Sequence, residues 1–316
     1  MYAIGIDIGG TKIGGAVVDE SGAIIAQDRV PSPAAHADQM EDAVAAMITR
    51  LSASYEVCAA GVAAAGFVNS KTGVIYYAPN IQWREEPFLD EMRGRVDLPL
   101  LVENDANAAG WGEFRFGAGR GVGDMVMLTI GTGVGGAIIG DGRLFRGGFG
   151  AGAELGHMRV VPGGLPCGCG MRGCIEQYGS GRALQRFAND LADAGGIGSV
   201  LAARRAADGG DLSGQAIADL VAKNDPGALA AVRELGGWIG QACASLDAIL
   251  DPEVFILGGG VAQLGDPLLG AVRAGFLASL PARGYHPEPT FRTALLGNRA
   301  GAAGVADLAR LSVQGD

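Results

Sequence analysis

One pattern occurs twice in the chain: an apolar run, a tight glycine turn and a second apolar run. The first copy covers residues 7–19 and the second covers residues 129–141. The order of apolar residues matches on both sides of the turn, which favours a duplicated domain over a chance likeness between two glycine-rich hairpins. A repeat of this length does not indicate a solenoid. The sequence therefore predicts two like domains, each with a β-hairpin that carries a glycine turn.

Composition and charge exclude several classes of protein. The 316 residues are 48% hydrophobic and 18% charged, which is typical of a globular protein long enough for two domains. The net charge of −10 argues against a nucleic-acid partner, because binding phosphates along a nucleic acid needs a basic surface. The longest apolar stretch, Val57–Val68, has 12 residues and is too short to span a bilayer. No signal peptide is recognised, so we expect a cytoplasmic protein without a membrane partner.

Strand and helix patterns alternate along the whole chain, which is typical of the α/β class. Runs rich in Ile and Val between glycine or proline residues predict strands over residues 2–8, 13–19, 23–30, 57–66, 100–103, 254–257 and 291–296. Apolar residues at helical spacing predict helices over residues 36–52, 106–116, 175–192, 215–222, 227–250 and 300–311. Residues 142–174 are expected to form a loop region, and the glycine-dense segment 117–123 is a predicted domain boundary.

The two glycine turns are candidate phosphate sites, because a turn without side chains lets backbone N–H groups approach phosphate oxygens. Neither turn matches the P-loop or the dinucleotide-binding pattern. The first turn adds Asp7, a possible ligand of hydrated Mg²⁺, and Thr11 and Lys12, which can contact phosphate. Two ordinary hairpins are the alternative interpretation. A third glycine turn, Gly258–Gly260, follows a predicted strand and is a weaker candidate for contact with a nucleoside.

Residues 103–107, Glu-Asn-Asp-Ala-Asn, lie between a predicted strand and a predicted helix. One interpretation is structural: Asn104 or Asp105 caps the N-terminus of the helix. The other is functional, because sites in open α/β sheets lie at the carboxyl ends of strands. In that case Asp105 could accept a proton from a hydroxyl nucleophile.

One histidine and three cysteines form a compact pattern. His157 is followed by Cys167, Cys169 and Cys174, with glycines between the cysteines. Zinc in structural sites is commonly held by one His and three Cys in a tetrahedron, and the glycines permit the chain to wrap tightly around an ion. Three reduced, buried thiols near a histidine are the alternative. Glu154 and Glu176 flank this loop, and a loop fixed by metal could present the two carboxylates to the vicinal hydroxyls of a sugar.

Together these motifs resemble the ROK family of repressors and sugar kinases. The motifs that carry the resemblance cover residues 7–12, 103–107, 129–136, 154–157, 167–176 and 283–288. The resemblance extends from residue 4 to about residue 312. It implies an actin-like ATPase fold, related to ribonuclease H, with two duplicated α/β domains and an inter-domain cleft. We expect a small domain of residues 1–117 plus 301–316 and a larger domain of residues 118–300 that holds the zinc loop.

The resemblance also implies roles for individual residues. Asp105 matches the catalytic base that deprotonates the 6-hydroxyl of the sugar. The matched sugar contacts are Gly66, Asn80, Asn104, Asp105, Glu154, His157 and Glu176. The matched ATP contacts are Asp7, Gly9, Gly10, Thr11, Lys12, Gly131, Thr132, Gly133, Gly258, Gly259 and Gly260. His157, Cys167, Cys169 and Cys174 match the ligands of a structural Zn²⁺.

Within this family the resemblance implies a glucokinase that uses ATP and Mg²⁺ and forms a homodimer or homotetramer. Kinases for N-acetylglucosamine, N-acetylmannosamine, mannose or fructose, and a polyphosphate-dependent glucokinase, are the nearest alternatives. A transcriptional repressor is the alternative from another functional class. It is disfavoured because Asp7 follows Met1 too closely for a DNA-binding helix-turn-helix to precede it, and because the net charge is negative.

Overall fold

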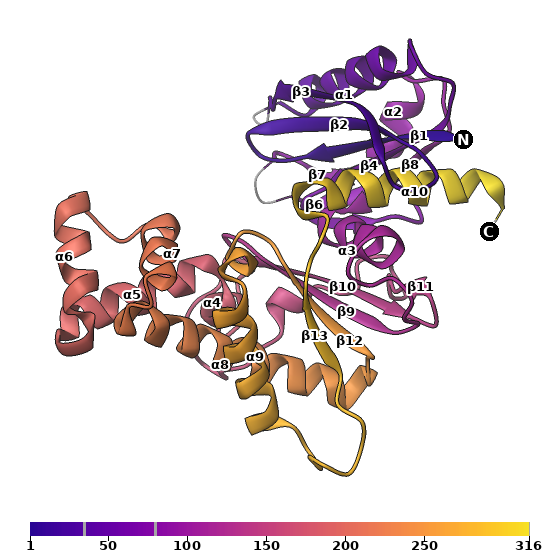
Figure 1. The fold of residues 1–316 in the computed structure, drawn as a ribbon. Coiled ribbons are helices and arrows are strands. Elements are labelled where there is room, and N and C mark those ends of the chain that lie inside the picture. The colour runs from indigo at the N-terminus through magenta and orange to yellow at the C-terminus, as the bar shows by residue number, and fades with distance from the viewer. Residues whose placement is uncertain (34–35, 79–80, 316) are drawn as a thin grey trace. The chain divides into compact units, whose positions relative to one another are not determined.

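The first five-stranded sheet combines an antiparallel meander with a parallel half. The computed structural model describes residues 1–33, 36–78 and 81–315. In spatial order its strands are β3 (Ile24–Pro31), β2 (Lys12–Val18), β1 (Tyr2–Ile8), β4 (Val57–Ala64) and β8 (Leu100–Asn104) (Figure 1). Antiparallel pairing joins β1 to β2 and β2 to β3, and parallel pairing joins β1 to β4 and β4 to β8.

The second five-stranded sheet repeats this order strand for strand, which confirms the duplication. In spatial order the strands are β11 (Arg143–Leu144), β10 (Val134–Gly140), β9 (Met125–Ile130), β12 (Val254–Gly258) and β13 (Thr290–Thr293). Strands β10 and β11 pair in antiparallel fashion, and β12 pairs in parallel with both β9 and β13. The two glycine turns thus join equivalent strands, β1 to β2 and β9 to β10.

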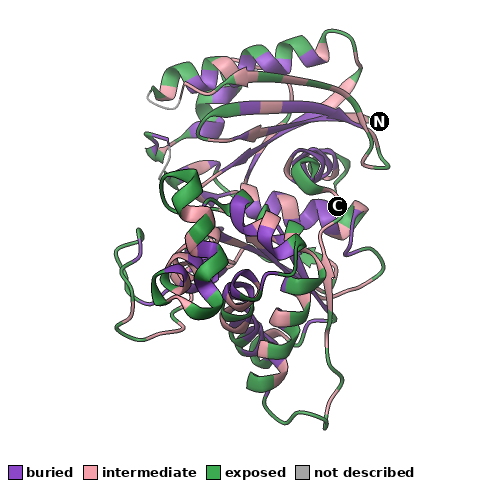
Figure 2. Ribbon diagram, turned by 60° about the vertical axis from the view of Figure 1, so that its left-hand side comes forward, coloured by how far each residue is buried: buried purple, intermediate pink, exposed green. Residues whose placement is uncertain are grey.

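Two helices cover the two faces of the first sheet, so its central strands are buried on both sides (Figure 2). Helix α1 (Ala37–Ser52) presents an apolar stripe at the predicted helical spacing. The buried apolar residues of that stripe are Met40, Val44, Ala45, Met47, Ile48 and Leu51. Helix α10 (Ala300–Gln314) covers the opposite face and also packs along α3 (Asp105–Phe116).

Helix α10 approaches the sheet so closely that its backbone touches the backbone of two strands. Gly5 on β1 and Gly61 on β4 are register partners, and each faces a carbonyl group of α10. A Cβ at Gly5 would collide with the carbonyl oxygen of Ala302, and a Cβ at Gly61 would collide with that of Val305. The absence of side chains at these two positions therefore sets the depth at which α10 lies.

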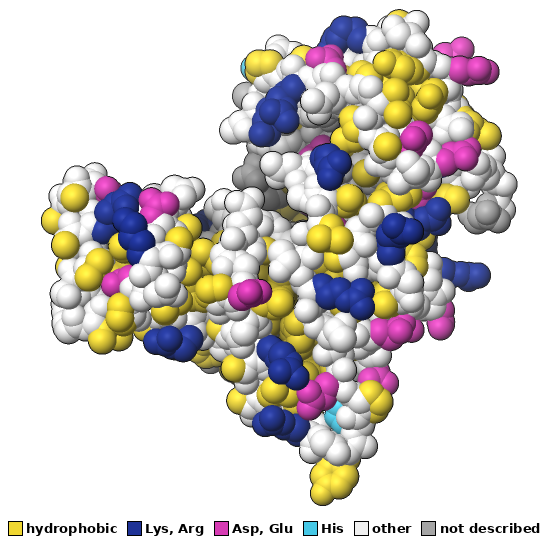
Figure 3. Space-filling model, in the orientation of Figure 1, with side chains coloured by type: hydrophobic (Ala, Val, Ile, Leu, Met, Phe, Trp, Pro, Cys, Tyr) yellow, Lys and Arg dark blue, Asp and Glu magenta, His cyan; other side chains and the backbone are white. Residues whose placement is uncertain are grey.

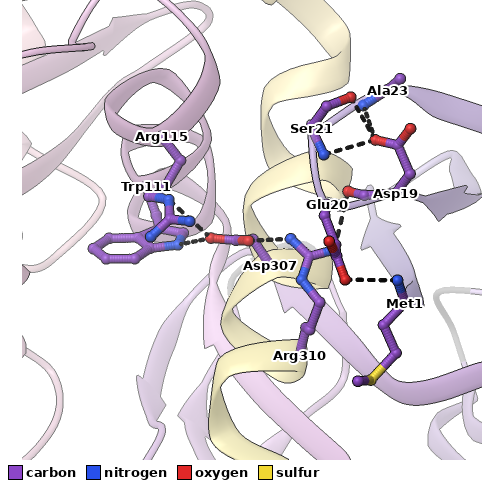
Figure 4. A network of polar contacts seen from close by, with 9 residues as sticks. All are labelled: Met1, Asp19, Glu20, Ser21, Ala23, Trp111, Arg115, Asp307 and Arg310. Atoms are coloured by element: carbon purple, nitrogen blue, oxygen red, sulfur yellow. Dashed lines mark hydrogen bonds and ion pairs between the residues drawn. The ribbon is translucent and has the colours of Figure 1, made fainter. Parts of the chain in front are cut away.

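A buried cluster centred on Asp307 joins α10 to α3 (Figure 4). Asp307 is fully buried and pairs with Arg310, which is 3% exposed. The other oxygen of Asp307 accepts a hydrogen bond from Trp111 Nε1 at 2.9 Å and lies 3.4 Å from Arg115 Nε. Arg310 also donates to the carbonyl oxygen of Asp19 at 2.9 Å, which ties the β2–β3 turn to the same cluster.

Most of the remaining helices belong to the second half of the chain. The predicted helix over residues 175–192 is interrupted at Ser180, which caps the second of two helices. The helices of this part are α4 (Glu176–Gly179), α5 (Gly181–Ala194), α6 (Ser199–Asp208), α7 (Gly214–Ala222), α8 (Pro226–Leu250) and α9 (Asp266–Ser279). The longest of them, α8, packs along α9.

Several short elements were not predicted from the sequence. A three-stranded sheet orders β5 (Phe67–Asn69), β6 (Val74–Tyr77) and β7 (Arg84–Glu86), and α2 (Phe88–Arg93) follows it. The predicted loop at 142–174 contains β11 and the short 3-10 helix Leu155–His157. The last strand ends at Thr293 rather than at residue 296.

Contacts divide the described chain into two compact units. The first comprises residues 1–123, 137–153 and 295–316, and the second comprises residues 124–136 and 154–294. None of the helices that the structure describes is both long and apolar enough to cross a membrane. On the face drawn in Figure 3, Lys and Arg side chains are scattered among Asp and Glu rather than gathered in one patch.

We expect the Asp307→Ala substitution to lower the free energy of unfolding by about 3–5 kcal/mol, because it leaves the buried guanidinium of Arg310 without its partner. Urea unfolding followed by circular dichroism measures the change. Asp90→Ala is the matched control, because it removes an exposed ion pair with Arg93 and should cost less than about 1 kcal/mol. A loss of similar size in both variants would contradict the assigned role of the buried cluster.

Candidate functional site

The first set of site residues begins at the β1–β2 hairpin. Asp7 lies near the end of β1, and Lys12 is the first residue of β2. The N–H of Gly9 donates to the carbonyl oxygen of Lys12 at 3.0 Å and closes the turn. Gly10 and Thr11 form the exposed tip between them. The turn therefore presents backbone N–H groups, a hydroxyl and an ammonium group beside a carboxylate.

The junction of β8 and α3 supplies the next two residues. Asn104 caps the helix, with its side-chain oxygen accepting from Asn107 N at 3.0 Å. This confirms the capping interpretation for Asn104, while Asp105 occupies the first turn of the helix. The side-chain amide of Asn104 donates to the carbonyl oxygen of Gly66 at 2.9 Å. The structure thus brings three predicted sugar-contact positions, Gly66, Asn104 and Asp105, together.

Gly66 could not be another residue without rearrangement. Its φ of +134° lies in a region that L side chains rarely adopt. A Cβ at this position would also collide with the carbonyl oxygen of Tyr77 on β6. Asn80, the other predicted sugar contact from this region, lies outside the described residues.

Two carboxylates meet at the same edge of the first sheet, because the parallel strands β1 and β8 both flank β4. Burial and then the negative charge of Asp105 raise the pKa of Asp7 to about 6, although the ammonium of Lys12 opposes the shift. Burial likewise raises the pKa of Asp105 above its usual range, although hydrogen bonds from the backbone N–H groups of Ala106 and of Asp105 itself oppose the shift. Each carboxylate therefore binds a proton more readily than an exposed aspartate does.

A groove of about 550 Å³ lies beside this hairpin, within the first unit. Asp7, Gly9 and Lys12 line it together with Arg29 and Arg299. Neither arginine belongs to a recognisable motif, so neither was predicted as a site residue. Arg29 on β3 pairs with Gly14 on β2, and this pairing places Arg29 beside the groove. No local sequence pattern indicates that pairing.

The second set of site residues surrounds the β9–β10 hairpin. Gly131 N donates to the carbonyl oxygen of Gly133 at 3.0 Å, so this turn is closed by a backbone bond that is one residue shorter than the bond from Gly9 to Lys12 in the first turn. A pocket of about 650 Å³ lies beside it in the second unit. Gly131, Thr132 and Gly260 line this pocket, together with side chains of α5 and α7. The structure therefore brings the second glycine turn and the end of the third glycine segment into one pocket.

The three glycines at 258–260 differ in what they contact. Gly258 ends β12 and packs beside Met127, and Gly259 has a φ of +82° and lies against the backbone of Ile130. A Cβ at Gly259 would collide with the backbone of β9, whereas one at Gly258 would displace only the terminal methyl group of Met127. Of these three glycines, only Gly260 lines the pocket.

Helix α5 contributes pocket residues that no sequence motif predicts. Gly181 N donates to the carbonyl oxygen of Gly131 at 2.8 Å, and Arg182 Nε donates to that of Thr132 at 3.0 Å. The first turn of α5 is thereby fixed to the glycine turn. Ser180, the N-cap of α5, lies inside the segment predicted as one continuous helix, and the approach of α5 to residue 131 depends on tertiary contact.

The four predicted zinc ligands converge. One ligand atom from each of His157, Cys167, Cys169 and Cys174 lies within 4.8 Å of all the others. Cys169 Sγ and Cys174 Sγ are 3.7 Å apart, as are Cys167 Sγ and His157 Nδ1. Sulfur atoms at about 2.3 Å from one tetrahedral zinc ion are separated by about 3.8 Å, so the residues fit a structural Zn²⁺.

The two flanking glutamates lie at either end of the zinc loop. Glu154 precedes the 3-10 helix that carries His157, and its carbonyl oxygen accepts from His157 N at 3.0 Å. Glu176 begins α4, and its carboxylate lies 3.7 Å from Cys167 Sγ and 3.4 Å from Val134 N. Glu176 thus joins the zinc loop to the β9–β10 hairpin.

Comparison with protein families gives one match along almost the whole chain. Residues 3–311 match the ROK family. A glucokinase from Streptomyces coelicolor is 44% identical over 308 residues, which are 97% of this chain and 97% of that protein.

Two solved structures extend the likeness to three dimensions. A ROK family glucokinase from Streptomyces griseus, in complex with glucose and AMPPNP, has a TM-score of 0.87 and 45% identity, covering 98% of this chain and 100% of that chain. A ROK hexokinase from Thermus thermophilus has a TM-score of 0.80 and 34% identity, covering all of both chains. The similarity thus extends over nearly the whole chain, including both five-stranded sheets.

We expect purified, untagged protein to contain about one zinc ion per chain, because four ligand atoms already converge on one point. Elemental analysis measures the content. Cys169→Ser should lose most of the zinc and melt at a lower temperature, whereas Cys58→Ser, which changes a thiol outside the cluster, should retain it. A wild-type content far below one ion per chain would show that the cluster holds no zinc.

Proposed function

Because the chain belongs to the ROK family, we propose that it is a glucokinase that transfers the γ-phosphoryl group of ATP to the 6-hydroxyl of glucose. One observation carries the proposal: the nearly full-length likeness to the Streptomyces griseus glucokinase, whose structure contains glucose and AMPPNP. The two carboxylates and the glycine turn of the first unit, and the glycine turn and cysteine cluster of the second unit, each agree with that chemistry.

Asp105 is the proposed general base. A sugar hydroxyl is a weak nucleophile, and a carboxylate that takes its proton as the bond to phosphorus forms makes it a stronger one. Burial raises the pKa of Asp105, which brings its proton affinity closer to what the transfer requires. The capping bonds of Asn104 hold the first turn of α3, so the carboxylate is presented from a rigid helix start.

The sugar would be bound by polar groups around this base and around the zinc loop. Asn104 and the backbone at Gly66 are joined by a hydrogen bond and offer both donors and acceptors. Further hydroxyl contacts are assigned to Asn80, Glu154, His157 and Glu176. Zn²⁺, held by His157, Cys167, Cys169 and Cys174, would fix the loop that carries the two glutamates.

The phosphate chain of ATP is assigned to the two glycine turns. In the turn of residues 9–12, Gly9 closes the turn, Gly10 and Thr11 offer backbone N–H groups, and the side chains of Thr11 and Lys12 offer a hydroxyl and an ammonium. Gly131, Thr132 and Gly133 offer the second turn. The nucleoside is assigned to the pocket that Gly260 lines. Mg²⁺ bound to the phosphates would neutralise charge in the transferred group, and Asp7 is the residue that would hold its hydration shell.

Three broader features follow from this assignment. Use of ATP favours a cytoplasmic protein. The proposed division into a domain of residues 1–117 plus 301–316 and a domain of residues 118–300 follows the two duplicated sheets. A homodimer or homotetramer is the proposed assembly.

A coupled assay with glucose, mannose, fructose, N-acetylglucosamine and N-acetylmannosamine, each with ATP or polyphosphate, tests the function. We expect glucose with ATP to give the highest kcat/KM.

Asp105→Ala should lower kcat by about 10²–10⁴-fold, because general-base catalysis typically contributes this much. Glucose binding by this variant, measured by calorimetry, should remain within about tenfold of wild type.

Two results would contradict the proposal separately. A higher kcat/KM with another sugar or with polyphosphate would change the substrate while leaving the reaction class intact. An Asp105→Ala variant that keeps more than about a tenth of the rate would remove the base assignment.

A further inference from the structure

A fully buried carboxylate lies directly before the proposed sugar and base residues. Glu103, the penultimate residue of β8, is 0% exposed. Its Oε1 accepts from Asn104 N at 3.0 Å and from Asn107 Nδ2 at 3.1 Å. Its Oε2 accepts from Arg146 Nε at 2.6 Å. Two neighbours in sequence and one distant arginine thus bond the carboxylate.

The arginine comes from the loop of residues 145–153, which follows β11 and runs directly into Glu154. The loop is folded back on itself, because Gly152 N donates to the carbonyl oxygen of Arg146 at 2.9 Å. It is also tied to the short sheet near β5, where Lys71 Nζ donates to the carbonyl oxygen of Gly148 at 3.1 Å. At Gly150, whose φ is +83°, a Cβ would press on Asn69. All these contacts lie within the first unit.

Hydrogen bonds continue from Glu103 into the residues that act on the sugar. Asn107 N bonds to the side chain of Asn104, whose amide in turn bonds to the carbonyl oxygen of Gly66. Asp105 lies between these two asparagines in the first turn of α3. A change in the position of Glu103 would therefore move the residues on both sides of the proposed base.

The negative charge of Glu103 makes its buried position depend on Arg146. A buried carboxylate needs a cation or several hydrogen bonds, and removal of a partner leaves it uncompensated. Among the described residues, Arg146 is the one basic side chain recorded in an ion pair with Glu103. It is 27% exposed at its side chain and lies on a loop rather than on the strand or helix it supports.

We propose that Arg146 is a positioning residue for phosphoryl transfer, which holds Glu103 and, through it, the Asn104–Asp105 junction in the geometry that binds and activates the sugar. The inference rests on the proposed function and deepens it. It also assigns a role to the loop of residues 145–153, whose attachment to β8 would then affect the sugar more than the nucleotide.

The kinetics of Arg146→Ala and Arg146→Lys test this role. For Arg146→Ala we expect KM for glucose to rise and kcat to fall, each by about tenfold or more, because small displacements of reacting groups are costly. KM for ATP should stay within about threefold of wild type. Arg146→Lys keeps the charge without the planar guanidinium, so it should recover part of the loss.

A double variant separates positioning from stability. Glu103→Gln combined with Arg146→Ala removes the uncompensated buried charge, so it should melt closer to wild type than Arg146→Ala alone. If Arg146 positions the junction, the raised KM for glucose should persist in this double variant. Arg93→Ala, which breaks an exposed ion pair on α2, is the matched control and should leave the kinetics unchanged.

The outcomes distinguish this inference from the proposed function. Folded Arg146 variants with wild-type KM for glucose and wild-type kcat would overturn the positioning role while leaving the kinase intact. Recovery of normal kinetics in the double variant would also overturn it, because the arginine would then serve stability alone. If Arg146→Ala does not fold, Arg146→Lys and the double variant decide the question. A wild-type protein that does not phosphorylate glucose would remove both proposals.

Discussion

Two partly buried carboxylates at the carboxyl ends of the parallel strands of the first sheet are the constraint on which the rest of this structure depends. The strand order places the ends of β1 and β8 on either side of β4, so Asp7 and Asp105 come close enough for the charge of one to affect the other. For Asp7 the pKa rises from 3.8 to about 6. Such a shift means that ionised Asp7 lowers the free energy of unfolding by at most about 3 kcal/mol, compared with an aspartate that keeps its ordinary pKa in the folded protein. That cost is present above about pH 6 and disappears as the pH falls below the ordinary pKa.

Other parts of the fold provide the rigidity that holds these groups in place. Helix α10 lies directly on the backbone of β1 and β4 because Gly5 and Gly61 carry no side chain. The Asp307 cluster joins α10 to α3, the helix that begins with Asp105. In the second unit, Glu176 connects the cysteine cluster to the β9–β10 turn, so a bound zinc ion would stiffen the turn as well as its own loop.

The sequence allowed accurate prediction of features that depend on local pattern. The strand Tyr2–Ile8, the helix ending at residue 52 and the His157 cluster follow from periodicity, glycine turns and ligand spacing. The doubled hairpin predicted two like sheets, and the matching strand orders confirm them. Helix boundaries such as the break at Ser180 were less accessible, because apolar residues continue at helical spacing across it.

Features that depend on long-range contact could not be predicted in this way. Arg182 reaches the carbonyl oxygen of Thr132, and Arg146 reaches Glu103, across 50 and 43 residues respectively. Neither arginine lies in a pattern that distinguishes it from the other 19 arginines of the chain. The short strands β5, β6 and β7 were missed for a related reason, because three- and four-residue strands carry too little alternation to be recognised.

The pH dependence of kcat for glucose phosphorylation, at saturating ATP and glucose, tests the central claim most directly. The base must be ionised to accept a proton, so the rate should fall as the pH decreases through the raised pKa of Asp105. Our account predicts an acid limb with a midpoint clearly above about 4, the ordinary value for aspartate, in protein that circular dichroism shows to be folded. A rate that stays constant down to that value would contradict the claim that the partly buried carboxylate of Asp105 accepts the proton during the transfer.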